Sequence, residues 1–388
     1  MEKTKKLNFY VQTKENQYYE RKSARVKPLD ILRQIVGFAN AEGGKLVIGI
    51  EDNGDITGFK CERAHKIDEY RNINITKLKE TPVMVEYEII DVTNINGEED
   101  KILVININFV KDKVVKSYDG KVYLRQYDKT IELNAEQIIE LQYDRGQRYF
   151  EDEIVEYATL NDLDEELLQE YKNKMGVPKI ETKKLLESRN LIIDGKLTNA
   201  CVLLFGNNPT KFLPQARLRF IKYEGLTAGV GTNFNIIKDV TFEKAIPKII
   251  KEIKIYISAN LREFQYLDMD GEFKIMPEYP EFAWFEGIIN ALVHRNYAIR
   301  GEYTRVIQYD DRLEISSPGL LPNIVNINNI TEKRYSRNPR IARFLTEFGW
   351  VREMNEGVKR IYSEMEKIFL KKPVYSEPSN KCIISFRK

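Results

Sequence analysis

The sequence is poor in the two residue types that build disulfide frameworks and zinc sites. Its 388 residues include three cysteines and two histidines. Cys61, Cys201 and Cys382 are odd in number and far apart, so they exclude a disulfide framework, and with so few histidines they also exclude a zinc constellation. A chain with this little cysteine fits a reducing compartment, and we predict a cytoplasmic protein.

The sequence also lacks long apolar runs and an excess of charge of one sign. A membrane-spanning helix needs about 18 consecutive apolar residues, and the chain has no such run. Its N-terminus, MEKTKKLNFYVQTKE, has no apolar segment of the signal-peptide type, so we expect no membrane partner. Lysine and arginine number 61 against 59 aspartates and glutamates. A nucleic-acid partner would therefore have to bind a local basic patch.

What the sequence does contain is the composition of an ordinary globular protein, 42% hydrophobic and 31% charged. At roughly 100–200 residues per domain, its length predicts two or three domains. Helical and strand patterns both occur throughout, so we expect an α/β or α+β fold with a mixed sheet in the N-terminal part. We place the domain boundaries at 1–145, 146–265 and 266–388, the middle segment being a linking region of helices and strands.

Local patterns predict individual elements. Pro28, followed by apolar residues at three- and four-residue steps and then by two glycines, predicts a helix over 28–43. The remaining predictions are a buried strand at 45–51, a hairpin at 83–92 and 101–110, a strand pair at 120–133, a solvated acidic helical connector at 151–170, and a strand, turn and strand within 197–225.

Acids and bases crowd together in the stretch ENQYYERK, residues 15–22. Glu15 and Glu20 precede the predicted helix, and Asp52 ends the following strand, where ligands tend to be held in α/β sheets. Residues five apart on a straight strand face opposite ways, so Glu15 must lie on a loop or beyond a bulge if it joins Glu20. Three converging carboxylates would suit Mg²⁺ or Mn²⁺, which can polarise a phosphodiester and lower the pKa of bound water.

Several bases accompany these acids. Residues 1–30 carry eight bases and four acids, and Arg21, Lys22, Arg25 and Lys27 are placed to contact the phosphates of a nucleic acid. We predict these four as nucleic-acid contacts and Lys22 also as a member of the catalytic set with the three acids. From spacing alone, a strand with alternating charge on its solvated face would give the same pattern.

This region, from ENQYYERK to ILRQIVGFANAEGGKLVIGIEDNGDITGF, resembles the Schlafen/AlbA-type domain. That family shows a Glu, four residues, a second Glu, a hydrophobe and a Lys, then a helix ending near FANAEGG and a strand ending in an acidic pair. The resemblance implies that Glu15, Glu20 and Asp52 form a metal-dependent site that cleaves transfer RNA and related RNAs, with Lys22 beside it. Arg21 departs from the family's apolar residue, and many bacterial members are described as DNA-binding or regulatory.

A second constellation lies in FEGIINALVHRNY, where Glu286, Asn290, His294 and Tyr297 follow one another at steps of four, four and three. This spacing places them near one face of a helix. A polar helix surface and a core histidine would produce the same spacing. Asn290, however, lies among isoleucines and alanine, and a buried amide needs a partner.

The pattern resembles the nucleotide-binding helix of GHKL-type ATPases, in the branch labelled RecG-like or divergent AAA, together with DRLEISSPGLLP, RNPRIARFL and NEGVKRI. The resemblance implies a C-terminal α/β sandwich that binds ATP. Asn290 would coordinate the Mg²⁺ of the triphosphate, Glu286 would activate water if hydrolysis occurs, and Gly319 and Gly357 would let the backbone approach the nucleotide. The other nucleotide-binding residues that it implies are His294, Asn296, Asp311 and Arg337.

Two departures from the GHKL pattern concern ATP. Ser316 or Ser317 stands where the wider group has an aspartate that binds adenine, and Asn355 replaces a glycine of the second turn. Arginines recur at every third residue from Arg334 to Arg343, a pattern that fits either a grip on phosphates or a solvated stripe. The chain stops at KCIISFRK, so we expect no winged helix after the ATPase region.

These observations lead to three functional hypotheses. The first is an ATP-binding endoribonuclease that uses Mg²⁺ or Mn²⁺ on transfer RNA or a similar RNA, with a role in stress or phage defence implied by the family context. The second is a non-enzymatic, ATP-binding transcriptional regulator that binds DNA through the basic residues. The third is a pseudo-ATPase scaffold that forms homodimers and binds neither ligand.

Overall fold

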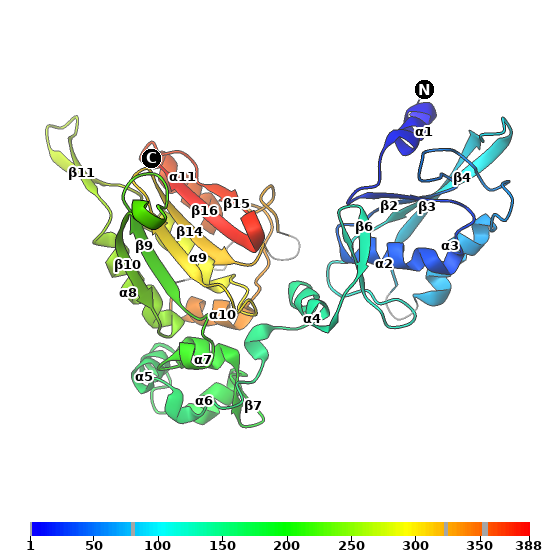
Figure 1. Cartoon of the computed structure of the whole chain (residues 1–388). Helices are drawn as coiled ribbons and strands as arrows, with labels where there is room; N and C mark the ends of the chain where they lie inside the picture. The colour runs from blue at the N-terminus through cyan, green and yellow to red at the C-terminus, as the bar shows by residue number, and fades with distance from the viewer. Residues whose placement is uncertain (1, 79–81, 322–324, 351–355) are drawn as a thin grey trace. The chain divides into compact units, whose positions relative to one another are not determined.

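The computed structural model describes residues 2–78, 82–321, 325–350 and 356–388. They form two compact units, Met1–Arg148 and Tyr149–Lys388, which we call unit 1 and unit 2 and describe separately (Figure 1). Helices combine with mixed sheets in both units, which confirms the expected α/β class. Within the described ranges, every helix is too short or too polar to cross a membrane.

Unit 1 is built on a four-stranded sheet with the order β1-β2-β4-β3. Its strands are β1 (Tyr19–Lys22), β2 (Gly44–Ile48), β3 (Val85–Thr93) and β4 (Glu99–Ile107). β1 and β2 are parallel, whereas β4 is antiparallel to both β2 and β3. Parallel neighbours need a crossover connection, and here it contains η1 (Pro28–Ile31) and α2 (Leu32–Asn40). The predicted helix, strand and hairpin of this region are confirmed.

Helices cover both faces of this sheet. They are α1 (Glu2–Gln12) on one face and α2 and α3 (Ile67–Lys77) on the other. The α1 face is filled by Tyr10 of the helix and Tyr19 of β1, which stack with ring centroids 6.1 Å apart. Because side chains alternate along a strand, Tyr19 and Arg21 point toward α1, while Glu20 and Lys22 point toward the α2 side.

A hairpin of two strands packs against α2. Its strands are β5 (Tyr123–Gln126) and β6 (Lys129–Glu132), and α4 (Ala135–Asp144) follows. Asn40, at the end of α2, is buried, and its Nδ2 donates to the carbonyls of Val115 and Tyr123, both at 2.9 Å. Its Oδ1 accepts the amide of Val115 at 2.8 Å. The asparagine of FANAEGG therefore fixes the hairpin region to the end of the helix.

Unit 2 contains a six-stranded sheet with the order β10-β9-β13-β14-β16-β15. Its strands are β9 (Leu218–Tyr223), β10 (Ile236–Phe242), β13 (Thr304–Gln308), β14 (Arg312–Pro318), β15 (Val374–Ser376) and β16 (Lys381–Arg387). β13 is parallel to β9, and the other neighbours are antiparallel. We placed the start of the third segment at residue 266. The sheet crosses that boundary, since β9 and β10 come before it and β9 pairs with β13 after it.

Helices pack on this sheet in a second layer. They are α8 (Ile246–Ser258), α9 (Glu281–Val293) and α11 (Gly357–Lys367). α9 packs on β13 and β14, and both α8 and α11 contact α9. α9 therefore lies between the sheet and its helical neighbours, and most of its length is buried.

The first part of unit 2 differs from two of our predictions. It contains η2 (Phe150–Asp152), η3 (Leu160–Asp162), α5 (Glu165–Lys174), α6 (Thr182–Ser188), β7 (Ile192–Ile193), β8 (Lys196–Leu197), α7 (Asn199–Phe205) and η4 (Pro209–Lys211). A later helix, α10 (Pro339–Glu347), contacts α7. The acidic segment is no solvated connector, since Glu151, Leu167 and Leu168 are buried. α7 is a helix where we expected a strand: it is buried along its whole length, and a fully apolar run gives no periodicity to separate the two.

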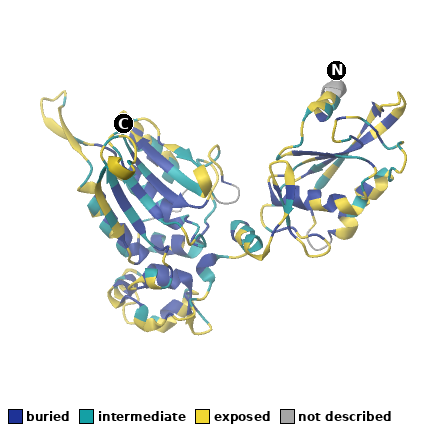
Figure 2. Ribbon diagram, viewed as in Figure 1, coloured by how far each residue is buried: buried dark blue, intermediate teal, exposed yellow. Residues whose placement is uncertain are grey.

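A second hairpin leaves the body of unit 2 between α8 and α9. Its strands are β11 (Glu263–Leu267) and β12 (Phe273–Pro277), and in the part of the chain that the structure describes they pair only with each other. Figure 2 shows this hairpin as an exposed projection. Our local patterns did not predict it.

Candidate functional site

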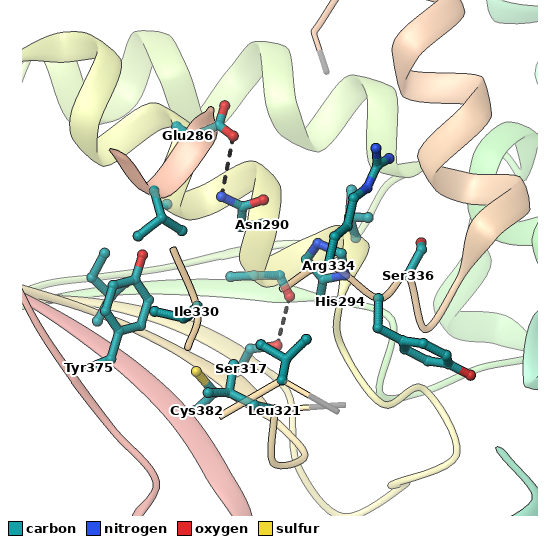
Figure 3. A pocket seen from close by; sticks show the side chains of 18 of the residues that line it. Glu286, Asn290, His294, Ser317, Leu321, Ile330, Arg334, Ser336, Tyr375 and Cys382 are labelled. Carbon is teal, nitrogen blue, oxygen red and sulfur yellow. Dashed lines mark hydrogen bonds between the residues drawn. The ribbon is translucent and has the colours of Figure 1, made fainter. Parts of the chain in front are cut away.

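A cavity of about 190 Å³ opens in unit 2 between α9, the end of β14 and the start of α11. Figure 3 shows its side chains. The polar residues that line it are Glu286, Asn290, His294, Ser317, Thr331, Lys333, Arg334, Tyr335, Ser336, Tyr375 and Cys382. Glu286 and Asn290 lie one turn apart on α9 and both face the cavity, as their spacing predicted.

Glu286 is held between two helices. Nδ2 of Asn290 donates to its Oε1 at 3.3 Å. On the other side, a Cβ placed on Gly357 at the start of α11 would lie 2.5 Å from the same oxygen, so a larger residue there would displace the carboxylate from this position. Burial raises the pKa of Glu286, against the lowering effects of the Asn290 hydrogen bond and the Arg360 charge.

His294 ends α9 at the wall of the cavity. Burial, with the nearby positive charges of Arg337 and Arg334, lowers its pKa to about 4. The imidazole is therefore neutral at physiological pH. Its Nδ1 is buried and has no hydrogen-bond partner within the described residues, so it offers a polar atom to a ligand.

The floor of the cavity is largely apolar. Ile315 and Ser317 of β14 and Ile384 and Cys382 of β16 form it, and Tyr375 of β15 lies beside them. The hydroxyl of Ser317 donates to the carbonyl of Ala291 at 2.7 Å, so its proton is already committed. An apolar floor with polar groups at one end suits an aromatic base carrying a phosphate chain.

Three of the residues predicted for nucleotide binding lie outside the cavity lining. The Asp311 carboxylate accepts from Arg312 in the turn before β14, at the opposite end of this strand from Gly319. Asn296 packs behind Gly319, where a glycine Cβ would lie 2.7 Å from the asparagine Cβ. Arg337 is buried and donates to the carbonyl of Leu320 at 3.1 Å. Glu286, Asn290, His294, Gly319 and Gly357 do line the cavity.

The arginine stripe divides in the structure. Arg334 lines the cavity, whereas Arg340 pairs with Asp152 and Arg343 approaches Glu347 at 3.4 Å. A grip on phosphates thus fits Arg334 alone among these three. Asn355 lies outside the described residues.

In unit 1, two of the predicted acids meet on one lysine. Glu15 lies on the loop after α1, as the sequence required. Nζ of Lys22 is 3.1 Å from Oε1 of Glu15 and 2.5 Å from Oε1 of Glu20. Burial lowers the pKa of Lys22, but the hydrogen bonds and charges of Glu20 and Glu15 outweigh it, so the pKa is raised. The ammonium stays charged between the two carboxylates.

Arg125, which the sequence analysis did not single out, holds the other side of Glu20. It donates to Oε2 of Glu20, to the carbonyl of Asn16 at 2.8 Å and to that of Tyr19 at 3.1 Å. It is 2% exposed and lies over the ring of Phe38, 5.0 Å from the centroid. Its place on β5, a hundred residues from the acids, left no local signal in the sequence.

The three predicted carboxylates do not form a divalent-cation site in this arrangement. Asp52 is exposed, and it contributes its main-chain carbonyl, which accepts from Arg21. Both oxygens of Glu20 are already paired with cations. Among the described residues, no three His, Cys, Asp or Glu side chains are grouped as metal ligands. The donor set therefore does not fit Mg²⁺ or Mn²⁺ as it stands, and we derive no metal-dependent step from it.

The predicted basic contacts also divide. Arg21 is 7% exposed, and Nη1 donates to the carbonyl of Val11 at 2.9 Å, so this guanidinium serves the packing against α1. Lys27 and Arg25 are exposed, and Arg25 is 3.0 Å from Oε1 of Glu51. A phosphate could reach Arg25 and Lys27. Arg21 is buried, so our prediction that it contacts nucleic acid is corrected.

Comparison with known families identifies both regions. Residues 15–134 match the family model described as "Schlafen, AlbA_2". Unit 1 carries a Schlafen AlbA_2 domain. Residues 301–386 match the model described as "Putative ATP-dependent DNA helicase recG C-terminal". The Schlafen AlbA_2 domain and the RecG-type domain together support a protein that binds nucleic acid and ATP.

Other comparisons bear on the fold around these two domains. The crystal structure of the DIP2311 protein from Corynebacterium diphtheriae is similar, with a TM-score of 0.51 and 20% sequence identity. The alignment covers 100% of this chain and 81% of that one, so the likeness in fold includes both the Schlafen AlbA_2 domain and unit 2. No curated protein sequence matches the chain.

The Schlafen AlbA_2 match begins at Glu15 and includes Arg125, so the residues that meet around Glu20 all fall within it. The RecG-type match begins at residue 301, after α9. Glu286 and Asn290 therefore lie outside the matched range, and their assignment to the cavity rests on the geometry given above.

Proposed function

We propose that unit 2 binds a nucleoside triphosphate of the ATP type in the cavity beside α9, and that unit 1 binds nucleic acid. The observation that carries the first part is the convergence of Asn290, Glu286 and Gly357 at one end of an apolar cavity. Arg334 and Lys333 supply positive charge for a phosphate chain on the same wall. The RecG-type match supports this reading of the fold.

The side chains of the cavity would divide the work by chemistry. Asn290 supplies an amide oxygen, the kind of ligand that Mg²⁺ on a triphosphate accepts. The neutral His294 offers a hydrogen bond without adding charge. The floor of Ile315 and Ile384 would cover the base. Ser316 or Ser317 stands where the wider GHKL group has the aspartate that binds adenine, and the hydroxyl of Ser317 already donates to Ala291. We propose binding and leave hydrolysis out of the proposal.

Replacing Asn290 tests this function. We expect Asn290→Ala to weaken binding of Mg·ATP by about tenfold or more, which corresponds to about 1.4 kcal/mol, while the far-UV circular dichroism stays unchanged. Asn173→Ala, in an exposed asparagine at the end of α5, is the matched control and should bind as the parent does. Isothermal titration calorimetry provides the measurement. Equal affinity of parent and Asn290→Ala, or no binding by the parent, would refute the proposal.

RNA cleavage by unit 1 is the second candidate. Mg²⁺ or Mn²⁺, its proposed cofactor, would have to displace Lys22 from Glu15 and Glu20, since these carboxylates do not form a cation site in the arrangement described above. The observation that favours it is the meeting of Glu15 and Glu20 on Lys22 at a partly exposed position. The Schlafen AlbA_2 match supports the nucleic-acid part. Transfer RNA and similar RNAs are the substrate class that we propose for it.

A gel assay separates this candidate from a non-enzymatic regulator. Total RNA and duplex DNA are incubated with the protein in Mn²⁺ and, separately, in EDTA. Cleavage predicts that Glu15→Gln and Glu20→Gln lose activity, while Glu62→Gln, at an exposed position, keeps it. If the parent leaves RNA intact but shifts duplex DNA in a salt-sensitive manner, a DNA-binding regulator is favoured instead.

A further inference from the structure

The hairpin of β11 and β12, which we call the arm, presents apolar side chains to solvent along its length. It projects from unit 2 in Figure 1, and nearly all of its residues are exposed in Figure 2. The large exposed apolar residues of the arm are Phe264, Tyr266, Leu267, Met269, Phe273 and Ile275. An apolar cluster of this kind on a surface marks an interaction site.

The register sorts these side chains onto two faces. Leu267 pairs with Phe273, and Gln265 pairs with Ile275, so these four share one face. Phe264 and Tyr266 lie on the other face with Met276 and Lys274. The apolar side chains of the Leu267 face are the more exposed: Phe273 on it is 77% exposed, against 44% for Phe264 and Tyr266 on the other face.

An arm of this construction is poorly stabilised by itself. An isolated two-stranded hairpin is at best marginal in water, and a third strand or a packed face is needed for stability. Among the described residues, each strand of the arm pairs with the other alone, so the arm has two open edges there and its side chains are exposed on both faces.

Charge along the arm is divided between its ends. The tip carries Asp268, Asp270 and Glu272, of which Asp268 is neutralised by Lys274. Lys222, Lys238 and Arg262 lie together at the root. The pKa of Lys222 is lowered, first by burial and then by the charges of Arg262 and Lys238, although the charge of Glu278 raises it. Two acids of the root are already engaged: Glu278 pairs with Lys388 at 2.5 Å, and Asp310 is 3.9 Å from Arg262. A third, Glu263, is exposed at the start of β11, so the bases Lys222, Lys238, Arg262 and Lys388 outnumber the acids of the root by one.

We propose that the arm is a self-association surface, and that two copies of the chain pack their arms antiparallel through the Leu267, Phe273 and Ile275 faces. In this arrangement the acidic tip of each arm lies over the basic root of the other. A two-fold axis relates the arms, so every such contact forms twice. Five residue pairs give an arm about 17 Å long at 3.4 Å per residue, which allows tip and root to overlap.

The acidic tip also argues against nucleic acid as the occupant of this surface. A phosphate backbone approaching the arm would meet Asp270 and Glu272 before it met any base of the arm. A second copy offers both the apolar face and the opposite charge, so the arrangement is complementary to itself.

Sedimentation velocity of the full chain over a range of concentrations tests the proposal. The parent is expected to reach twice the mass of the single chain. Phe273→Glu should weaken self-association by roughly tenfold or more, since it removes a central aromatic anchor. Tyr157→Glu replaces an aromatic residue that is 89% exposed outside the arm, and it should associate as the parent does.

A charge exchange keeps the test sharp if Phe273→Glu disturbs the arm itself. Asp270→Lys and Arg262→Glu should each weaken association, and the double variant should recover most of it, because the reversed charges again meet across the two-fold axis. A parent that stays monomeric at all concentrations overturns the proposal. So does a dimer that withstands Phe273→Glu, or a loss of RNA binding in that variant without a change in mass.

Discussion

Arg125 shows how one buried side chain sets the geometry of the acids in unit 1. Its guanidinium joins Glu20 to the carbonyls of Asn16 and Tyr19, so it fixes both the strand and the turn that precedes it. The carboxylate of Glu20 is itself 4% exposed. The two buried charges compensate each other, and removing one side chain would leave the other charge buried without this partner.

Removing the arginine should be costly. We expect Arg125→Met to lower the free energy of unfolding by about 3–5 kcal/mol, because Glu20 would keep a buried charge without its guanidinium. Urea-induced unfolding followed by circular dichroism measures this. Arg63→Met, at an exposed arginine, should stay within about 0.5 kcal/mol of the parent. Adding Glu20→Gln to Arg125→Met should restore part of the loss, and a strictly additive double variant would contradict the pairing.

At the scale of residues, helical spacing was the reliable signal. Glu286, Asn290 and His294 were predicted to share a face, and they line one cavity. The prediction for Asp52 was wrong and Arg125 was missed for the same reason: the positions of both residues depend on how separate segments pack. Glu20 is paired by a residue of β5, and neither the spacing of the acids nor the charge of residues 1–30 contains that contact.

Among the elements, α10 depends on a residue far away in the sequence. Both carboxylate oxygens of Glu151 accept hydrogen bonds from backbone amides in the first turn of α10. The donors are Arg340 at 2.7 Å and Ile341 at 3.0 Å. Asn338, just before the helix, donates to the carbonyls of Val293 and Arg295 at the end of α9. The N-terminus of α10 is thus fixed to η2 on one side and to the cavity helix on the other.

This cap predicts a pH dependence. Burial raises the pKa of Glu151 from 4.5 to about 7, despite the two amides that it accepts. The native state then holds more protons than the unfolded state between these values, so the stability from this group is full below pH 4.5 and is lost as the pH rises through 7. Relative to Glu151→Gln, the parent should lose on the order of 3 kcal/mol of unfolding free energy between pH 5 and 8.

Chemical denaturation of both proteins at several pH values provides the comparison. Glutamine keeps the shape and one acceptor oxygen but cannot titrate, so its stability lacks this contribution at every pH. Parallel stability curves for the two proteins would show that Glu151 does not titrate in this range.

The elements also show where periodicity stops being informative. The helix that contains α2 was predicted from apolar residues at three- and four-residue steps, and the structure has it. α7 is apolar on every side and was mistaken for a strand, because burial on all sides removes the alternation on which such predictions depend. The acidic segment before α7 was wrongly predicted to be solvated because of its many charges. Two of its acids, Glu151 and Asp164, accept backbone amides as helix caps inside unit 2.

For the whole molecule, the order of strands in space could not be predicted. The chain divides into two units near residue 148, whereas we placed three segments along it. Nothing local indicates that β9 pairs with β13, across more than eighty residues, or that the arm interrupts this connection. Long-range pairing is set by the joint packing of the sheet on α9 and its neighbours.

The strand order also bears on how the chain is made. β16 lies between β14 and β15, and it forms the floor of the cavity through Cys382 and Ile384. During synthesis, unit 1 can close as soon as its 148 residues have emerged. In unit 2, the edge of β14 stays unpaired until residues 381–387 have been synthesised. A ribosome that stalls in α11 would therefore leave that edge exposed to other chains.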